Sequence, residues 1–191
     1  MNYELSGKRL AIVAIILAGA TGLAWLLSRE TEVSLPQLEK PSLVVKKGKR
    51  QLQVFDGGKL VKTYKIAIGS NPSDDKQIEG DGRTPEGDFY LAVKNPASRF
   101  HRSLGLSYPN IEDAMRGLRE NLIANSEHDE IVRAITENRL PPQNTALGGE
   151  IYIHGGGTEK DWTRGCIALE NNEMQELFDA LPYGISVTIE K

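Results

Sequence analysis

Residues 151–169 read IYIHGGGTEKDWTRGCIAL. The apolar run 151–153 predicts a strand that delivers His154 into a triple glycine, and Cys166 leads into a second apolar run at 167–169. Cys166 is the only cysteine of the chain, and His154 is one of its 3 histidines. Because a thiolate attacks carbonyl groups and an imidazole can remove the thiol proton, this stretch predicts a cysteine nucleophile with a histidine base.

The glycines and charges around this pair favour the catalytic interpretation over a structural one. A lone cysteine is more often a small buried hydrophobe, and a lone histidine at a strand end is more often structural. In this chain, however, Gly155 permits a sharp turn after the histidine. Gly165 lets a substrate carbonyl approach the N–H groups of Gly165 and Cys166, which would form an oxyanion hole. Arg164 and Lys160 add positive charge, which favours the thiolate.

The same stretch resembles the active-site signature of a known family. The segments IHG and TRGCIAL, followed by a predicted helix and a final strand, are similar to the signature of the YkuD-like L,D-transpeptidases. The segment RTPEG, residues 83–87, is similar to a second motif of that family. The resemblance covers about residues 42–190 and implies a cysteine enzyme of peptidoglycan biosynthesis and cell wall organisation, with a possible part in cell shape.

The resemblance also implies roles for individual residues. Cys166 would be the nucleophile, His154 the base, and the carbonyl of Gly155 the group that orients the imidazole. The amides of Gly165 and Cys166 would hold the oxyanion. The implied donor is a peptidoglycan stem peptide, cut after the L-centre of a diamino acid joined to D-alanine, and no cofactor is implied.

Four further residues are candidates for substrate binding: Arg164, Thr163, Trp162 and Arg83. Many family members have a histidine where Arg164 stands and a substrate-holding arginine where this chain has Ala168. We therefore hypothesise that Arg164 supplies the missing charge. Three functions stay open: an L,D-transpeptidase, an L,D-carboxypeptidase or amidase on the same fold, and a non-catalytic wall-binding module.

The N-terminal residues 1–29 are predicted to lie outside the globular domain. Lys8 and Arg9 precede residues 10–27, which carry no charge. A helix of that length spans about 27 Å, close to the ~30 Å hydrocarbon core of a bilayer. The basic flank predicts a cytoplasmic N-terminus and a domain outside the cytoplasmic membrane. The family resemblance implies that this domain lies in the periplasm of a bacterial envelope. A signal anchor is favoured over a cleaved signal peptide and secretion, because the apolar run is long and lacks a small-x-small cleavage site.

Composition fits one folded domain at residues 42–191, preceded by a linker at residues 30–41. Of the 191 residues, 39% are hydrophobic and 26% are charged, as in ordinary domains that bury a core. The net charge of −3 gives no indication of nucleic-acid binding. The dispersed histidines and single cysteine give no metal-ligand pattern.

The predicted fold is mainly β, a sheet or sandwich with decorating helices. Helices are predicted to begin at Asn110, at Ser126 paired with Asp129, and at Asn171 or Asn172. The glycine- and proline-rich segment 69–87 is predicted to be a long surface loop. Strands are predicted at residues 42–45, 51–55, 59–68, 88–93, 103–107, 151–153 and 186–190.

Overall fold

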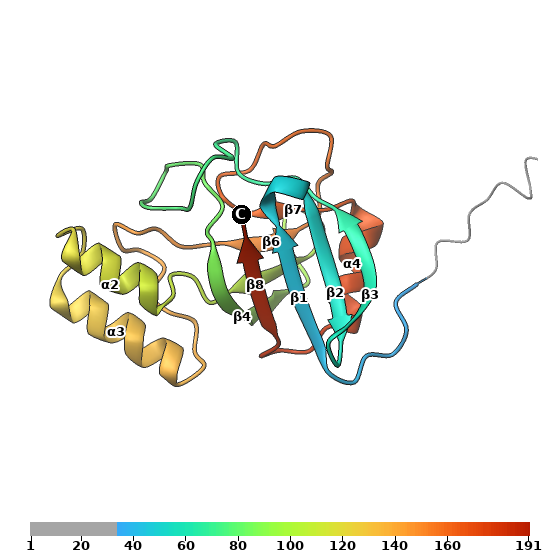
Figure 1. The fold of residues 1–191 in the computed structure, drawn as a ribbon, viewed down its shortest axis with the longest axis horizontal. Helices are drawn as coiled ribbons and strands as arrows, with labels where there is room; N and C mark the ends of the chain where they lie inside the picture. The colour runs from blue at the N-terminus through green and yellow to red at the C-terminus, as the bar shows by residue number, and fades with distance from the viewer. Residues whose placement is uncertain (1–33) are drawn as a thin grey trace, which may run out of the picture. The chain divides into compact units, whose positions relative to one another are not determined.

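A single curved sheet organises the part of the chain that the computed structural model describes, residues 34–191. Residues Leu35–Lys191 form one compact unit. The sheet order is β3-β2-β1-β8-β4-β5-β6-β7 (Figure 1). The strands are β1 Pro41–Lys46, β2 Gln51–Asp56, β3 Lys59–Lys65, β4 Gly87–Asn95, β5 Ser103–Leu106, β6 Tyr152–His154, β7 Ile167–Ala168 and β8 Ser186–Glu190. The helices are η1 Lys47–Lys49, α2 Ile111–Arg119, α3 Asn125–Thr136 and α4 Asn171–Ala180. The prediction of a mainly β domain with a few helices is confirmed.

The two ends of the sheet are linked by the segment that follows β3. Ala67 N donates to Ala168 O over 2.9 Å, and Ala168 N donates back to Ala67 O over 2.8 Å. Ser70 N then donates to Thr163 O over 2.9 Å. The strand predicted for residues 59–68 is therefore right as far as Lys65. Its last residues leave β2 and pair with β7, which curls the sheet.

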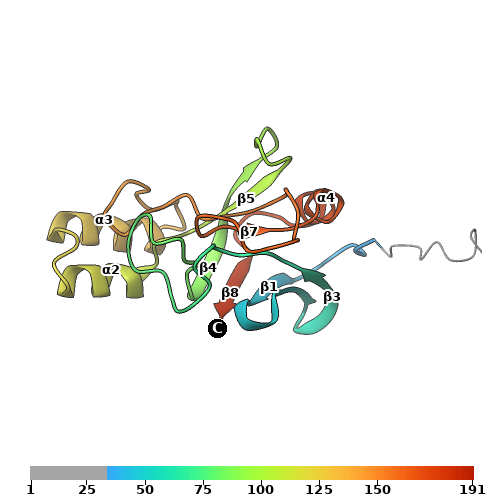
Figure 2. The same cartoon turned by 90° about the horizontal axis from the view of Figure 1, so that it is seen from above.

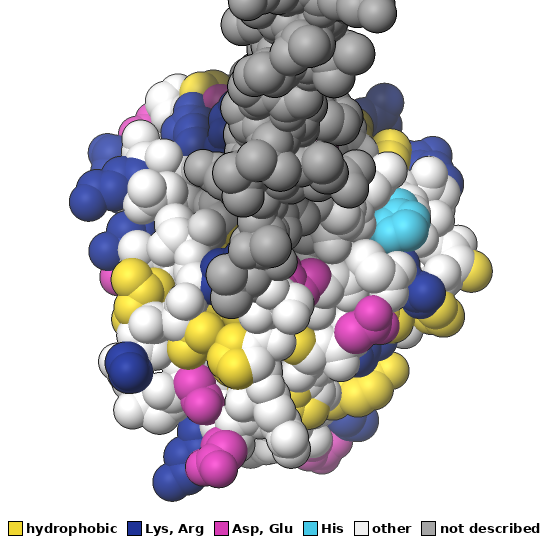
Figure 3. Space-filling model, turned by 90° about the vertical axis from the view of Figure 1, so that its right-hand side faces the viewer, with side chains coloured by type: hydrophobic (Ala, Val, Ile, Leu, Met, Phe, Trp, Pro, Cys, Tyr) yellow, Lys and Arg dark blue, Asp and Glu magenta, His cyan; other side chains and the backbone are white. Residues whose placement is uncertain are grey.

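The core alternates along the strands as a pleated backbone requires. Leu52 and Val54 on β2, and Val187 and Ile189 on β8, are buried while their neighbours are more accessible. Helix α4 contributes Met174 and Leu177 to the same core and lies at the opposite end of the domain from α2 and α3 (Figure 2). On the face drawn in Figure 3, charged side chains of both signs are dispersed among apolar and uncharged ones.

Helices α2 and α3 form a hairpin inserted between β5 and β6. A separate hydrophobic cluster holds them together and consists of Ala114, Ile123, Ile131 and Leu147. The predicted N-cap of α2 is confirmed. Asn110 Oδ1 accepts a hydrogen bond from Asp113 N over 2.9 Å, and the Asp113 carboxylate accepts one from Asn110 N over 3.1 Å.

The other two predicted helix starts are wrong by one or two residues. Helix α3 is capped by the backbone of Ala124, not by Ser126, because the Glu127 carboxylate accepts from Ala124 N over 2.8 Å. Helix α4 is capped at Glu170, because the Glu173 carboxylate accepts from Glu170 N over 3.2 Å. In both helices an acidic side chain in the first turn fixes the start.

The predicted membrane-spanning helix at residues 10–27, like all of residues 1–29, lies outside the described residues. Within residues 34–191, no helix combines the length and apolar character needed to cross a bilayer. The described part of the predicted linker is not a free spacer. Leu35 and Leu38 pack against the core, and Leu35 N donates to the Glu176 carboxylate. The linker prediction is wrong for these residues because their leucines have an apolar surface to cover.

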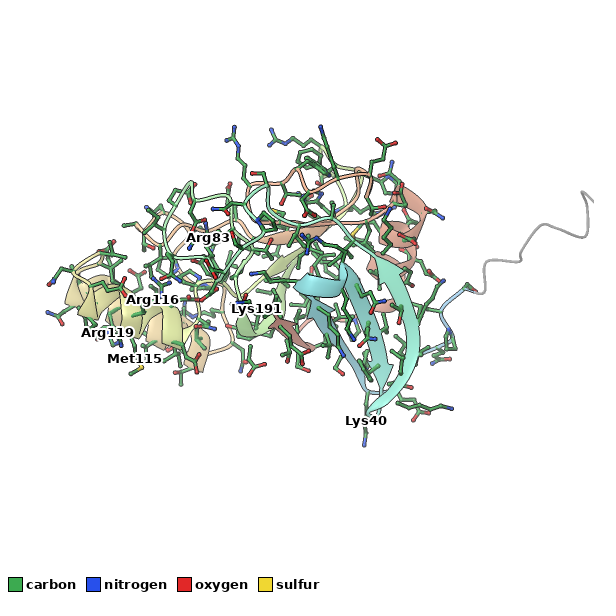
Figure 4. All side chains as sticks on the ribbon, turned by 45° about the horizontal axis from the view of Figure 1, so that its top comes forward. Lys40, Arg83, Met115, Arg116, Arg119 and Lys191 are labelled. Carbon is green, nitrogen blue, oxygen red and sulfur yellow. The ribbon has the colours of Figure 1, made fainter. Side chains whose placement is uncertain are left out.

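The segment 69–87 is a surface loop held by buried cations. Lys47 is only 2% exposed, and its Nζ donates to Asp74 O, Thr84 O and the Glu86 carboxylate over 2.7–2.8 Å. Lys76, also buried, donates to Ile78 O and Asp81 Oδ1. On the side of α2, the guanidinium of Arg116 (Figure 4) donates to the carbonyls of Lys76 and Gln77 over 3.2 and 3.1 Å. The loop is thereby fixed to η1 through Lys47 and to the helical hairpin through Arg116.

Candidate active site

His154 ends β6, and Cys166 directly precedes β7, the adjacent parallel strand at one end of the sheet. His154 is the last residue of β6 and pairs with Ala168 of β7. Because Cys166 precedes Ala168 by two residues, the Cα atoms of His154 and Cys166 are about 8 Å apart. Tyr152 N, two residues before His154, donates to Cys166 Sγ over 3.4 Å. The structure therefore places the predicted nucleophile and base in the same neighbourhood.

The thiol of Cys166 is held as a neutral donor in this conformation. Its Sγ donates to the carbonyl of Glu150 over 3.3 Å. Burial raises the pKa of Cys166, the hydrogen bond from Tyr152 N opposes that rise, and the Glu150 carboxylate adds to it. Among the hydrogen bonds of the described residues, none joins the thiol to His154. Proton transfer between them requires rotation of the cysteine side chain or a bridging water, as is common before substrate binds.

The imidazole of His154 is buried and oriented by the neighbouring carbonyl. His154 Nδ1 lies 2.6 Å from Gly155 O, the contact that the family resemblance implies. Because a carbonyl only accepts hydrogen bonds, Nδ1 carries the proton and Nε2 keeps a free lone pair. Burial lowers the pKa of His154, the Gly155 contact opposes this, and the positive charge of Arg99 lowers the pKa further. A neutral imidazole with an unprotonated Nε2 is the form that can act as a base.

Two aromatic rings confine this imidazole. The ring of Phe100 stacks on His154 with centroids 4.7 Å apart and planes 21° apart. Trp162 meets it edge-on with centroids 5.6 Å apart, and Trp162 Nε1 donates to Gly157 O over 3.2 Å. Trp162 was a sequence candidate, whereas Phe100 was missed. Phe100 lies far from the motif in sequence, and only the packing of the β4–β5 hairpin brings it to His154.

Gly165 shapes the turn that presents the cysteine. Its φ is +126°, and a Cβ at this position would lie 2.6 Å from Arg83 O. Gly165 N donates to Thr163 Oγ1 over 3.2 Å, and the same hydroxyl donates to Cys166 O over 2.6 Å. Thr163 is buried, so its hydroxyl serves the turn and does not face a substrate. The Gly165 amide, predicted to hold an oxyanion, already has an acceptor.

The remaining basic candidates take different positions. Arg164 is exposed. Arg83 is half-buried on the loop that packs under Gly165 (Figure 4), and its Nη1 donates to Asp75 O over 3.3 Å. The Nε of Arg83 is buried without a hydrogen-bond partner in the described part of the chain. Ala168, at the position where the family resemblance implies a substrate-holding arginine, is fully buried.

An open groove of about 860 Å³ lies beside Trp162, and neither His154 nor Cys166 is among its lining residues. Its walls come from the triple glycine, the polar loop after it and the start of α4. The lining residues are Gly156, Gly157, Glu159, Lys160, Trp162, Glu170, Asn171 and Asn172. Within residues 34–191, no group of three or more His, Cys, Asp or Glu side chains is arranged to hold a metal ion.

We expect Glu150→Gln to shift alkylation of Cys166 by iodoacetamide to lower pH. The Glu150 carboxylate is one of the groups that raise the pKa of Cys166, so removing its charge lowers that pKa and increases the thiolate fraction at a given pH. The measurement is the alkylation rate from pH 6 to pH 10. Glu150→Asp keeps the charge and serves as the control. An unchanged curve for Glu150→Gln at low ionic strength, where screening is weakest, would exclude the electrostatic role.

Comparison with known proteins places these features in context. Residues 40–189 match the family model YkuD, described as the L,D-transpeptidase catalytic domain. The helical cell shape determining protein Pgp2 from Campylobacter jejuni is 25% identical, with a TM-score of 0.53 over 85% of this chain and 52% of that one. Bdellovibrio bacteriovorus Bd1075 is 23% identical, with a TM-score of 0.51 over 82% of this chain and 52% of that one. The chain thus spans about half the length of these two solved structures. No curated protein matches the chain.

Proposed function

Because the chain belongs to the YkuD family of L,D-transpeptidase catalytic domains, we propose that it is a cysteine-dependent L,D-transpeptidase acting on peptidoglycan stem peptides. The observation that carries this proposal is the contact of His154 Nδ1 with Gly155 O, which leaves Nε2 as the acceptor of an imidazole on the strand next to the chain's single cysteine. Similarity to Pgp2, a helical cell shape determining protein, supports a role in shaping the wall.

The proposed reaction begins when His154 Nε2 takes the proton of Cys166 Sγ. The thiolate forms a bond to the carbonyl carbon of the diamino acid, and the amide of Cys166 stabilises the resulting oxyanion. His154 then returns the proton to the amine of D-alanine as the carbon–nitrogen bond breaks, which leaves a thioester on Cys166. An amine of a second stem attacks the thioester, His154 removes its proton, and the sulfur leaves.

The open groove beside Trp162 supports transfer, because it offers a second stem a binding surface next to the ring that contacts the imidazole. A buried Ala168 in place of the family's arginine supports hydrolysis by water, as in an L,D-carboxypeptidase or amidase. A wall-binding module without catalysis would need neither an oriented imidazole nor a thiol at the strand end.

We further propose that residues 1–29 anchor the protein in the cytoplasmic membrane, with residues 10–27 as the span. Residues 42–191 would then act in the periplasm. The alternative is cleavage of the N-terminal segment and release of the domain into the periplasm.

Incubating the full-length chain with purified sacculi and analysing the muropeptides tests the proposed function. We expect new cross-links between two diamino acids. Shortened stems without such links would instead indicate hydrolysis, and unchanged muropeptides with retained protein would indicate binding alone.

A further inference from the structure

The tip of the β4–β5 hairpin is fastened to the strand end that carries His154. Gly155 N donates to Phe100 O over 3.1 Å. A Cβ on Gly155 would lie 2.9 Å from the same oxygen, so the two backbones are in close contact. Because the Phe100 ring also stacks on the imidazole, the tip of the hairpin is held against His154.

Two arginines lie close to Phe100 in the sequence, and they make different contacts. The Arg102 guanidinium lies 4.8 Å from the ring centroid of Phe178, and its Nε donates to the Gln175 side chain, so Arg102 is engaged with α4. The Arg99 guanidinium lies 4.8 Å from the ring centroid of Phe100 and is exposed. Within residues 34–191, no hydrogen bond or ion pair occupies its N–H groups.

Arg99 is close enough to act on the reacting groups. Its positive charge lowers the pKa of both His154 and Cys166. Lys76 also lowers the pKa of Cys166, but Lys76 is buried and bonded to Asp81. Of these two cations, Arg99 is the one whose donors are open to a ligand.

The chemistry of the leaving group identifies the ligand that the open donors of Arg99 would bind. His154 protonates the amine that leaves, so the leaving residue must lie on the His154 side of the scissile bond. If that residue is the last of the peptide, its carboxylate is only two bonds from the amine nitrogen. A planar guanidinium binds a carboxylate through two parallel hydrogen bonds.

We propose that Arg99 binds the free carboxylate of the leaving residue, which makes the site selective for scissile bonds to a C-terminal residue. This inference rests on the proposed function and assigns the donor's carboxylate to the hairpin instead of to Arg164 or the position of Ala168. The Phe100 ring contacts both the guanidinium and the imidazole and so couples their positions.

The test compares two synthetic stem peptides that end in a diamino acid and D-alanine, one with a free carboxylate and one with a terminal carboxamide. For the full-length chain we expect kcat/KM to favour the carboxylate by about 10- to 100-fold. Arg99→Gln should remove this preference by slowing only the carboxylate peptide, and Arg99→Lys should restore part of it. Arg102→Gln is the matched control and should keep the preference.

Either of two results would overturn the assignment: Arg99→Gln keeps the carboxylate preference, or Arg164→Gln alone abolishes it. Calorimetric binding of both peptides to a Cys166→Ala variant, with and without Arg99→Gln, separates this proposal from the proposed function. If the native protein turned over neither peptide but bound the carboxylate peptide selectively through Arg99, catalysis would be refuted and the role of Arg99 in binding would stand. Equal turnover of both peptides by the native protein would retain catalysis and refute Arg99.

Discussion

Cys166→Ser abolishes measurable cross-linking and stem shortening in the sacculus assay, with a loss of at least about 10³-fold in turnover. A serine hydroxyl in the same place is a far weaker nucleophile, and the neutral imidazole of His154 is too weak a base to ionise it. The measurement is the rate of muropeptide change, together with the mass of the protein after brief exposure to donor peptide. The native chain should carry the acyl group, and the serine variant should not.

The control for this variant is its stability. A serine hydroxyl is smaller than the thiol and can keep the hydrogen bonds to Glu150 O and from Tyr152 N, so the unfolding temperature should stay close to that of the native chain. Iodoacetamide should inactivate the native chain and leave the serine variant unlabelled, because Cys166 is the only cysteine. A serine variant that retained more than a tenth of native turnover would show that another group is the nucleophile.

Gly165→Ala is expected to lower the free energy of unfolding by roughly 3 kcal/mol and to remove most activity. The backbone there has φ +126°, which side chains with a Cβ avoid, and the new methyl would collide with Arg83 O at 2.6 Å. Arg83 O is a backbone atom and a Cβ has no rotatable bond, so relief requires moving the turn that presents Cys166. For a chain of this size the unfolding temperature should fall by roughly 6–12 °C.

Gly184→Ala is the matched control for that substitution. Gly184 also has a positive φ, +77°, but a Cβ there would meet nothing within 4 Å. It should cost only the backbone strain, roughly 1 kcal/mol, and leave turnover unchanged. If the two variants lost equal stability and Gly165→Ala kept full activity, the close contact between Gly165 and the loop of Arg83 would contribute to neither stability nor activity.

The sequence reveals those parts of the candidate site that are local in the chain. The strand ending at His154, the glycine turn and the position of Cys166 before a short strand follow from apolar runs and glycines within residues 151–169. Because the resemblance covers the same residues, it also implied the contact between His154 and Gly155. The α2 start was predictable because both capping partners, Asn110 and Asp113, lie within one turn.

What the sequence did not reveal depends on segments that meet only in the fold. Phe100 reaches His154, and Arg99 packs on Phe100, because β5 pairs with β6. Nothing in the sequence around these two residues indicates this. The carbonyl of Glu150 accepts a hydrogen bond from the thiol. Glu150 has a positive φ of 54°, which its residue type does not indicate. Thr163 was a candidate for substrate contact because it lies beside Arg164. In the structure its hydroxyl accepts from Gly165 N and donates to Cys166 O within the turn.

The buried ammonium of Lys47 has a consequence for the loop that carries Arg83 and Thr84. It gathers three oxygen ligands, two carbonyls and one carboxylate, from a segment with no regular secondary structure. A calcium ion organises loops in other proteins in the same way, by offering one positive centre to several oxygens. Here the charge is covalently part of the chain, so the wall beneath the nucleophile is assembled by folding itself and cannot be stripped by a chelator.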